Sequence, residues 1–234
     1  RPRLGGRLRL AAVPPHKARY GEACDYLERE IRKLGVDIHL NAAVTEVELD
    51  SRKPDAVILA TGSVPFVPPI QGLSGGGAVL VDDVLEGRAP VGRRVAIIGG
   101  GAIGAETAHL LVEEEDREVY LIEMRDGIAV DLPQDARICL LHAFEQTPSL
   151  HQITNAKVTA VTPESITLER QGQTEVVDRL DTIILAVGAR PNQGLRPALE
   201  ALGIPFLVSG DATGPKDYVK AIYEGFVAGN TIAE

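Results

Sequence analysis

RRVAIIGGGAIGAETAHLLVEEEDREVYLIE, residues 93–123, is the stretch that decides the fold of this chain of 234 residues. Its apolar run at residues 95–98 is typical of a strand that is buried on both faces. Glycines then follow in the order G-x-G-x-x-G, with one more inside the motif: Gly99, Gly100, Gly101 and Gly104. A helical pattern covers residues 102–115, and a second β-rich run, residues 119–122, ends at Glu123. The order strand, glycine turn, helix and strand predicts a βαβ unit in a parallel sheet.

Each part of this unit has a role in binding a dinucleotide. Gly99 allows the sharp turn out of the strand, Gly101 lets a pyrophosphate approach the backbone, and Gly104 lets the helix pack tightly on the strand. The start of the helix offers unpaired N–H groups and partial positive charge to phosphates. Glu123 stands where a carboxylate accepts hydrogen bonds from ribose hydroxyls. We therefore predict a dinucleotide site here; the alternative is a glycine-rich turn that only packs a helix on a sheet.

Composition and charge argue against several classes of protein. A hydrophobic content of 44% and a charged content of 24% are ordinary for a globular protein, and 234 residues suit two moderate domains. A net charge of −9 argues against a nucleic-acid partner. No apolar run approaches the ~18 residues that a membrane span requires, and no signal peptide is recognisable. We expect a cytoplasmic protein with no nucleic-acid or membrane partner. The sequence is compatible with a homo-oligomer.

The cysteines and histidines are not spaced for redox or metal chemistry. Cys24 and Cys139 lie far apart and form neither a C-x-x-C pair nor a metal set. Dithiol flavoenzymes need two cysteines a few residues apart, so their mechanism is excluded. The five histidines show no ligand spacing. We expect no metal site and no side chain that acts as a catalytic acid or base.

The rest of the chain alternates predicted strands and helices around the glycine unit. Helices are expected at residues 16–34, 81–85, 133–144 and 216–229. Strands are expected at residues 36–40, 43–49, 56–59, 181–187 and 206–209, with an antiparallel meander at residues 157–161, 165–170 and 174–177. Residues 74–77 are expected to form a flexible linker. The predicted fold class is α/β, a doubly wound Rossmann-type dinucleotide-binding domain with a β-meander.

Four short motifs resemble those of the two-dinucleotide flavoprotein reductases. They are Ala60-Thr61-Gly62 at a strand end, GGGAIGAE at residues 99–106, AVGARPN at residues 186–192 and Ser209-Gly210-Asp211. The stretch LGGRLRLAAVPP, residues 4–15, is more specific. It resembles the old-yellow-enzyme-like NADH:flavin oxidoreductases, the group of 2,4-dienoyl-CoA reductase, enoate reductase and trimethylamine dehydrogenase. The resemblance covers nearly the whole chain.

This resemblance implies an NAD(P)H-binding domain that is inserted in a partial FAD-binding Rossmann-like domain. We expect the FAD-binding part at residues 1–73 and 204–234, without its own G-x-G-x-x-G unit, and the NAD(P)H-binding part at residues 74–203. In the group, a first FAD βαβ unit precedes the stretch that matches residues 4–15. A catalytic barrel with FMN and an iron–sulfur cluster lies further upstream. Both are the partners expected in the complete protein.

The motif and the resemblance together predict two sets of cofactor-binding residues. The set for NAD(H) or NADP(H) is Gly99, Gly100, Gly101, Ala102, Ile103, Gly104, Glu123, Met124, Arg125 and Gly188. The set for FAD is Ala60, Thr61, Gly62, Gly210 and Asp211. Without the first βαβ unit the FAD pyrophosphate lacks its main backbone cradle, so weak or no FAD binding is expected of this chain alone. Glu123 favours NAD by repelling a 2′-phosphate, and Arg125 keeps NADP open.

Three functions are compatible with these residues. The first is an electron-transfer part of a flavin-dependent oxidoreductase, in which NAD(P)H passes a hydride to FAD. The second is a non-catalytic structural module that holds ADP or another nucleotide in a larger flavoprotein. The third is a small reductase that borrows FAD from a partner chain. Glu106, in the first turn of the predicted helix, either stabilises the helix dipole or borders the nicotinamide.

Overall fold

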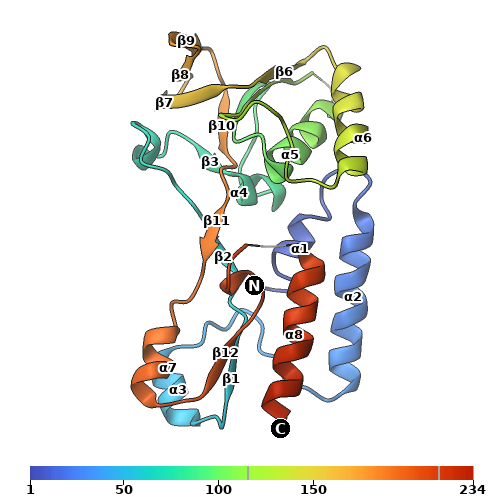
Figure 1. Ribbon diagram of the computed structural model, residues 1–234, viewed down its shortest axis with the longest axis vertical. Coiled ribbons are helices and arrows are strands. Elements are labelled where there is room, and N and C mark those ends of the chain that lie inside the picture. Colours follow the sequence, from blue (N-terminus) through green and yellow to red (C-terminus); the bar gives the residue numbers. More distant parts are fainter. Residues whose placement is uncertain (115, 216, 234) are drawn as a thin grey trace. The chain divides into compact units, whose positions relative to one another are not determined.

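The computed structural model describes residues 1–114, 116–215 and 217–233. The chain forms two compact units, and each is built from segments that are distant in the sequence (Figure 1). Unit 1 consists of Arg1–Arg9, Gly21–Pro65 and Ala189–Glu234, and unit 2 consists of Leu10–Tyr20 and Phe66–Gly188. Most of unit 2 is therefore an insertion between two segments of unit 1. The predicted boundaries between the FAD-binding and NAD(P)H-binding parts, at residues 73/74 and 203/204, remain a prediction.

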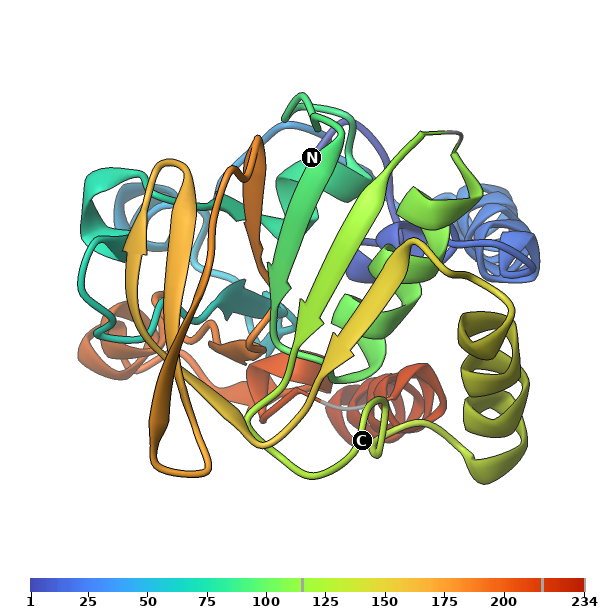
Figure 2. The same cartoon turned by 90° about the horizontal axis from the view of Figure 1, so that it is seen from above.

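Unit 2 is built on a five-stranded sheet in which every neighbouring pair is parallel. The strands in spatial order are β3 (Val79–Leu80), β10 (Thr182–Leu185), β4 (Arg94–Ile98), β5 (Glu118–Ile122) and β6 (Leu150–Ile153). In Figure 2 the green to yellow arrows of β4, β5 and β6 lie side by side. Helix α5 (Ala102–Glu113) connects β4 to its parallel neighbour β5. This arrangement confirms the predicted α/β class and the βαβ unit.

The two faces of this sheet pack against different elements of unit 2. Val95 and Ile97 of β4 belong to a core cluster with Ala105, Ala108 and Leu111 of α5. Their neighbours Ala96 and Ile98 belong to a second cluster, which includes residues of the meander. The meander is the antiparallel sheet of β7 (Ala156–Thr162), β8 (Ser165–Arg170) and β9 (Gln173–Val177). Because side chains alternate along a strand, β4 is buried on both sides, as its apolar composition predicts.

Further helices complete the unit. Helix α4 (Val81–Leu85) follows β3, and α6 (Gln134–Glu145) lies between β5 and β6 in the chain. Part of the expected linker at residues 74–77 forms the 3₁₀ turn η1 (Leu73–Gly75). Helices α1 (Arg7–Leu10) and α2 (Ala18–Lys33) lie at the start of the chain and contain residues of both units, with most of each in unit 1. Glu115, the predicted end of the glycine-unit helix, lies outside the described residues.

Unit 1 contains two short sheets and a small core of its own. Strands β1 (Val57–Leu59) and β12 (Phe206–Val208) form a parallel pair, and β2 (Ser63–Pro65) pairs antiparallel with β11 (Ala189–Pro191). Its helical elements are α3 (Glu46–Arg52), α7 (Arg196–Leu202), the 3₁₀ turn η2 (Gly210–Ala212) and α8 (Tyr218–Ala233). Leu49, Leu59 and Leu199 form its buried core. Lys216, the predicted start of the last helix, lies outside the described residues.

Two predicted strands are wrong. Residues 36–40 form no strand, and residues 46–49 of the second prediction belong to α3. The reason for the helix is a capping box: the Thr45 side chain accepts from Glu48 N at 3.3 Å, and Thr45 N donates to Glu48 Oε2 at 3.2 Å. Helical geometry then turns Leu49 into the core and leaves Val47 exposed. Strands β2, β3, β6 and β11 and helices α1 and α7 were not predicted.

No helix among the described residues has the length and apolar character needed to cross a bilayer. Helix α8 nevertheless exposes large apolar side chains: Val219 (62% exposed), Tyr223 (65%) and Phe226 (69%).

Candidate dinucleotide-binding site

The glycine turn between β4 and α5 has a geometry that only glycine can adopt at two positions. Gly99 has a φ of +106°, and a Cβ atom there would lie 2.5 Å from the carbonyl oxygen of Ala186. A Cβ atom at Gly104 would collide with the carbonyl oxygen of Gly99. The first turn of α5 is therefore in direct contact with the end of β4. This close packing is what the G-x-G-x-x-G spacing predicts.

The N-terminus of α5 carries no cap from its own sequence. Gly101 is the N-cap residue and has no side chain, so Ala102 and Ile103 begin the helix with unsatisfied N–H groups of the backbone. A carboxylate from elsewhere takes one of them: Ala102 N donates to Asp131 Oδ1 at 2.9 Å. The neighbouring Gly100 N donates to Glu123 Oε2 at 2.8 Å. The positive end of the helix thus faces two acidic side chains.

Glu123 ends β5 and is buried, with 5% of its surface exposed. One oxygen accepts from Gly100, and the other accepts from Arg125 N at 2.9 Å and Arg125 Nε at 3.1 Å. Burial acts to raise the pKa of Glu123, but the hydrogen bonds from Arg125 and Gly100 outweigh it and hold the pKa below its usual value. The carboxylate predicted to bind ribose is therefore ionised and directed at the backbone and at Arg125.

Arg125 and Met124 follow Glu123 at the surface. The Arg125 side chain is 46% exposed, and Nη2 lies 3.7 Å from the position that a Cβ atom of Gly101 would occupy. Arg125 is therefore a cation beside the glycine turn. Met124 is 69% exposed. Gly188, the last predicted residue of the set, has a φ of +99° and accepts from Phe66 N at 3.0 Å.

Asp131 is a site residue that no sequence pattern predicted. It lies in the segment between β5 and α6, which is held against the glycine turn by a hydrogen bond from Ala129 N to Gly100 O at 2.7 Å. No motif marks it, since it is 29 residues from the N–H group that it accepts. Only the folded chain brings the two together.

The motifs predicted to bind FAD meet in unit 1. Ala60-Thr61-Gly62 follows β1, and Gly210-Asp211 follows its parallel neighbour β12, so both lie at the same edge of the pair. Ser63 Oγ donates to Asp211 Oδ2 at 3.0 Å, and Asn192 N donates to Gly62 O at 2.9 Å. Gly210 N donates to Glu224 Oε2 of α8 at 2.9 Å. This edge therefore combines a glycine with a φ of +72° at Gly62 and a carboxylate at Asp211.

A family model described as pyridine nucleotide-disulphide oxidoreductase matches residues 50–214. The chain belongs to this family. It therefore carries the oxidoreductase type of dinucleotide-binding fold, as the glycine unit predicts. Despite the family's name, Cys24 is a buried free thiol in unit 1 and Cys139 an exposed free thiol in unit 2. Among the described residues no group of three or more His, Cys, Asp or Glu side chains could hold a metal ion.

Relatives of the chain are reductases and oxidases by name. Bilirubin reductase of Mediterraneibacter gnavus is 36% identical over 230 residues, which are 98% of this chain and 35% of that protein. NADH oxidase of Thermoanaerobacter brockii is 32% identical over 229 residues, 95% of this chain and 35% of that protein. A structure of 2-naphthoyl-CoA reductase with 2-naphthoyl-CoA matches with a TM-score of 0.89 at 25% identity, covering 97% of this chain and 34% of that one.

These matches have two consequences. They confirm the resemblance to the old-yellow-enzyme-like reductases that residues 4–15 indicate. The chain also spans only about a third of the length of these relatives, and so corresponds to one part of each of them.

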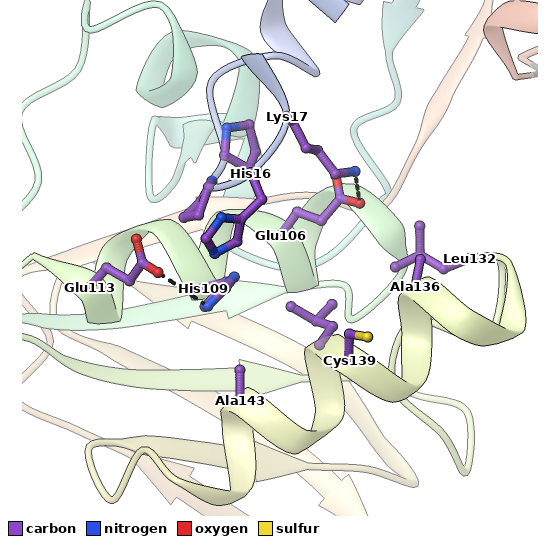
Figure 3. A pocket seen from close by; sticks show the side chains of 12 residues that line it. His16, Lys17, Glu106, His109, Glu113, Leu132, Ala136, Cys139 and Ala143 are labelled. Carbon is purple, nitrogen blue, oxygen red and sulfur yellow. Dashed lines mark hydrogen bonds and ion pairs between the residues drawn. The ribbon is translucent and has the colours of Figure 1, made fainter. Parts of the chain in front are cut away.

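Unit 2 also contains a cavity of about 480 Å³ (Figure 3). Helices α5 and α6 and residues 14–17 line it. Glu106 pairs with Lys17 at its rim and is 8% exposed, while His109 Nε2 lies 3.5 Å from Glu113 Oε1. The Glu106 carboxylate therefore forms an ion pair with the Lys17 ammonium group.

Proposed function

We propose that this chain is the nucleotide-binding, electron-transfer part of a larger flavin-dependent oxidoreductase. The observation that carries the proposal is the fit of Gly104 against Gly99, which packs the N-terminus of α5 on the end of β4 with no side chain between. This geometry brings the backbone N–H groups at the start of α5 to the place where a pyrophosphate would bind. When both cofactors are bound, the chemistry they supply is hydride transfer from NAD(P)H to FAD. The residues of this chain bind and orient the nucleotide.

The experiment that tests the proposal uses the complete protein. Under anaerobic conditions NADH is mixed with it, and flavin absorbance is followed. Bleaching of the flavin supports the proposal. If NADH or ADP binds at the glycine turn and the absorbance stays unchanged, the chain is a structural nucleotide-binding module instead. Bleaching that needs a second chain carrying FAD would favour the small reductase that borrows its flavin.

The choice between NADH and NADPH depends on Glu123 and Arg125. The ionised Glu123 disfavours a 2′-phosphate, and its ion pair with Arg125 offsets part of that charge. We propose that the chain prefers NADH and tolerates NADPH. A preference for NADPH in parallel titrations would reject this part of the proposal.

Replacing Arg125 by Ala is expected to weaken NADPH binding about five- to thirtyfold and to change NADH binding less than about threefold. The reason is that Arg125 is the exposed cation beside the glycine turn, and only the 2′-phosphate needs it. Isothermal titration calorimetry with both nucleotides measures the effect. Lys157→Ala on the exposed side of β7 removes the same charge as a control. Equal losses for the two nucleotides would contradict the assignment.

We further propose that the complete protein supplies a first FAD βαβ unit and a catalytic barrel. Two features of unit 1 support this. In the described chain, β1 and β12 form a parallel pair with no third strand, although parallel sheets are normally larger and covered on both faces. Helix α8 also exposes an apolar surface of the kind that another domain covers. Two free thiols support a cytoplasmic location.

The chain of 234 residues is expected to bind FAD weakly or not at all when purified alone. Asp211 and Gly62 fit part of an FAD site, but among its described residues unit 1 has no G-x-G-x-x-G turn between a strand and an α-helix. Each remaining contact is worth only about 1–3 kcal/mol. The flavin absorbance that remains after gel filtration with excess FAD measures the binding. One FAD retained per chain would show that the cradle is complete without a further unit.

A further inference from the structure

The carboxylate of Asp131 occupies the place at which a nucleotide diphosphate would meet helix α5. Ala102 N donates to its Oδ1 at 2.9 Å. Its Oδ2 and Oδ1 lie 3.2 and 3.5 Å from the position of a Cβ atom on Gly101. Gly101 is the glycine that allows a pyrophosphate to approach. Asp131 therefore uses the same N–H group and the same positive helix end as the proposed ligand.

This position is imposed by the backbone around Asp131. Ala129 N donates to Gly100 O at 2.7 Å, and Leu132 N donates to Ala129 O at 3.1 Å, so a tight turn fixes Asp131 beside the glycines. Ile128 and Ala129 are buried, and Ala129 has a φ of +52°. The turn is anchored in the core, but the side chain of Asp131 lies at the surface and is exposed. Rotation about χ1 is thus enough to move the carboxylate into solvent while the turn stays in place.

We propose that Asp131 is a built-in competitor of the nucleotide: its carboxylate caps α5 in the nucleotide-free protein and leaves when a diphosphate binds. The proposal rests on the function proposed above. Two anions at hydrogen-bond distance from one N–H group repel each other strongly, so both cannot stay. The ligand class is a nucleoside diphosphate or a dinucleotide, since the glycine N-cap of α5 and the positive end of this helix suit a diphosphate.

The competition lowers affinity and speeds release. Each binding event breaks the hydrogen bond from Ala102 to Asp131 before it gains the phosphate contacts. When the nucleotide leaves, the returning carboxylate restores the cap. Asp131 is therefore a residue that sets the nucleotide dissociation constant, and its effect should depend on the negative charge rather than on the size of the side chain.

The test compares Asp131→Asn with Asp131→Glu in the complete protein, with NADH binding and competition by inorganic pyrophosphate as readouts. Asp131→Asn is expected to bind NADH about five- to thirtyfold more tightly and to lower the inhibition constant of pyrophosphate, because the repelling charge is gone. Asp131→Glu keeps the charge and should stay within about threefold of the wild type. Asp135→Asn, in the first turn of α6, removes an equal charge elsewhere and serves as the matched control.

Thermal stability separates this competition from a purely structural role. Without nucleotide, Asp131→Asn should melt at a lower temperature, since α5 loses an ionised cap. A structural role alone would lower stability and leave NADH affinity unchanged or weaker, which would overturn the proposal. An equal gain in affinity for Asp135→Asn would also overturn it, because the effect would then be one of net charge. If neither the wild type nor Asp131→Asn binds NADH at all, both the proposed function and the competitor role of Asp131 are wrong.

Discussion

A Gly104→Ala variant is expected to lose about 1–3 kcal/mol of unfolding free energy and to bind NADH at least about tenfold more weakly. The added methyl group would collide with the carbonyl oxygen of Gly99 and would lie 3.3 Å from Ala186 Cβ. Helix α5 would have to move away from β4, which displaces the N–H groups that face the phosphates. Urea denaturation measures the stability, and calorimetry with NADH measures the affinity.

Gly225→Ala is the matched control for this prediction. It makes the same chemical change inside helix α8, where no atom beyond the neighbouring residues and backbone of that helix lies within 4 Å of the new methyl group. Alanine is the better helix former by about 1 kcal/mol, so this variant should be as stable as the wild type or more stable. If Gly104→Ala behaved like Gly225→Ala, the close contact between α5 and β4 would be absent in solution.

Glu123→Gln is expected to lower the free energy of unfolding by about 1.5–3 kcal/mol at neutral pH. An ionised carboxylate accepts from Gly100 N and from Arg125, whereas the amide turns its NH₂ group toward one of these donors. The buried N–H group of Gly100 or the Arg125 side chain then loses its partner. Because Gly100 is part of the glycine turn, NADH binding should weaken as well.

The effect of Glu123→Gln should depend on pH in a defined direction. The pKa of Glu123 in the folded protein lies below its usual value, so its ionised form stabilises the fold fully above about pH 4.3, the ordinary glutamate value. That contribution is lost as the pH falls through the folded pKa. Urea denaturation at several pH values should therefore show a difference from the wild type that is largest near neutrality and shrinks in acid.

Glu175→Gln on the exposed strand β9 provides the comparison for this pH series. It should change the unfolding free energy by less than about 0.5 kcal/mol at every pH. A difference for Glu123→Gln that stayed constant down to acidic pH would mean that ionisation of Glu123 does not stabilise the fold.

Local sequence signals predicted the elements whose contacts are short in sequence. The strand, glycines, helix and strand of residues 93–123 were predicted because periodicity and turn chemistry act within a few residues. The meander was predicted for the same reason, since its strands are joined by short polar turns. Residues 4–15 likewise indicated the group of relatives, because their resemblance lies in one continuous stretch of residue types.

The errors arose where one local signal overrode another. Residues 43–49 are rich in β-branched side chains, yet Thr45 and Glu48 carry the capping-box spacing that starts a helix. That signal was present in the sequence and was outweighed by β propensity. Strand β6 was missed because it becomes a strand only by pairing with β5, and its partner is distant in the chain.

The sequence by itself determined the glycine turn, the parallel sheet around it and the family to which the chain belongs. Those features depend on residue types at fixed short spacings, where backbone sterics leave little choice. Only the tertiary structure decided what faces the helix N-terminus. Glu123 accepts hydrogen bonds from Gly100 and Arg125, and Asp131, 29 residues further along the chain, accepts one from Ala102 N. Such contacts join groups that the fold brings together, and no spacing along the chain encodes them.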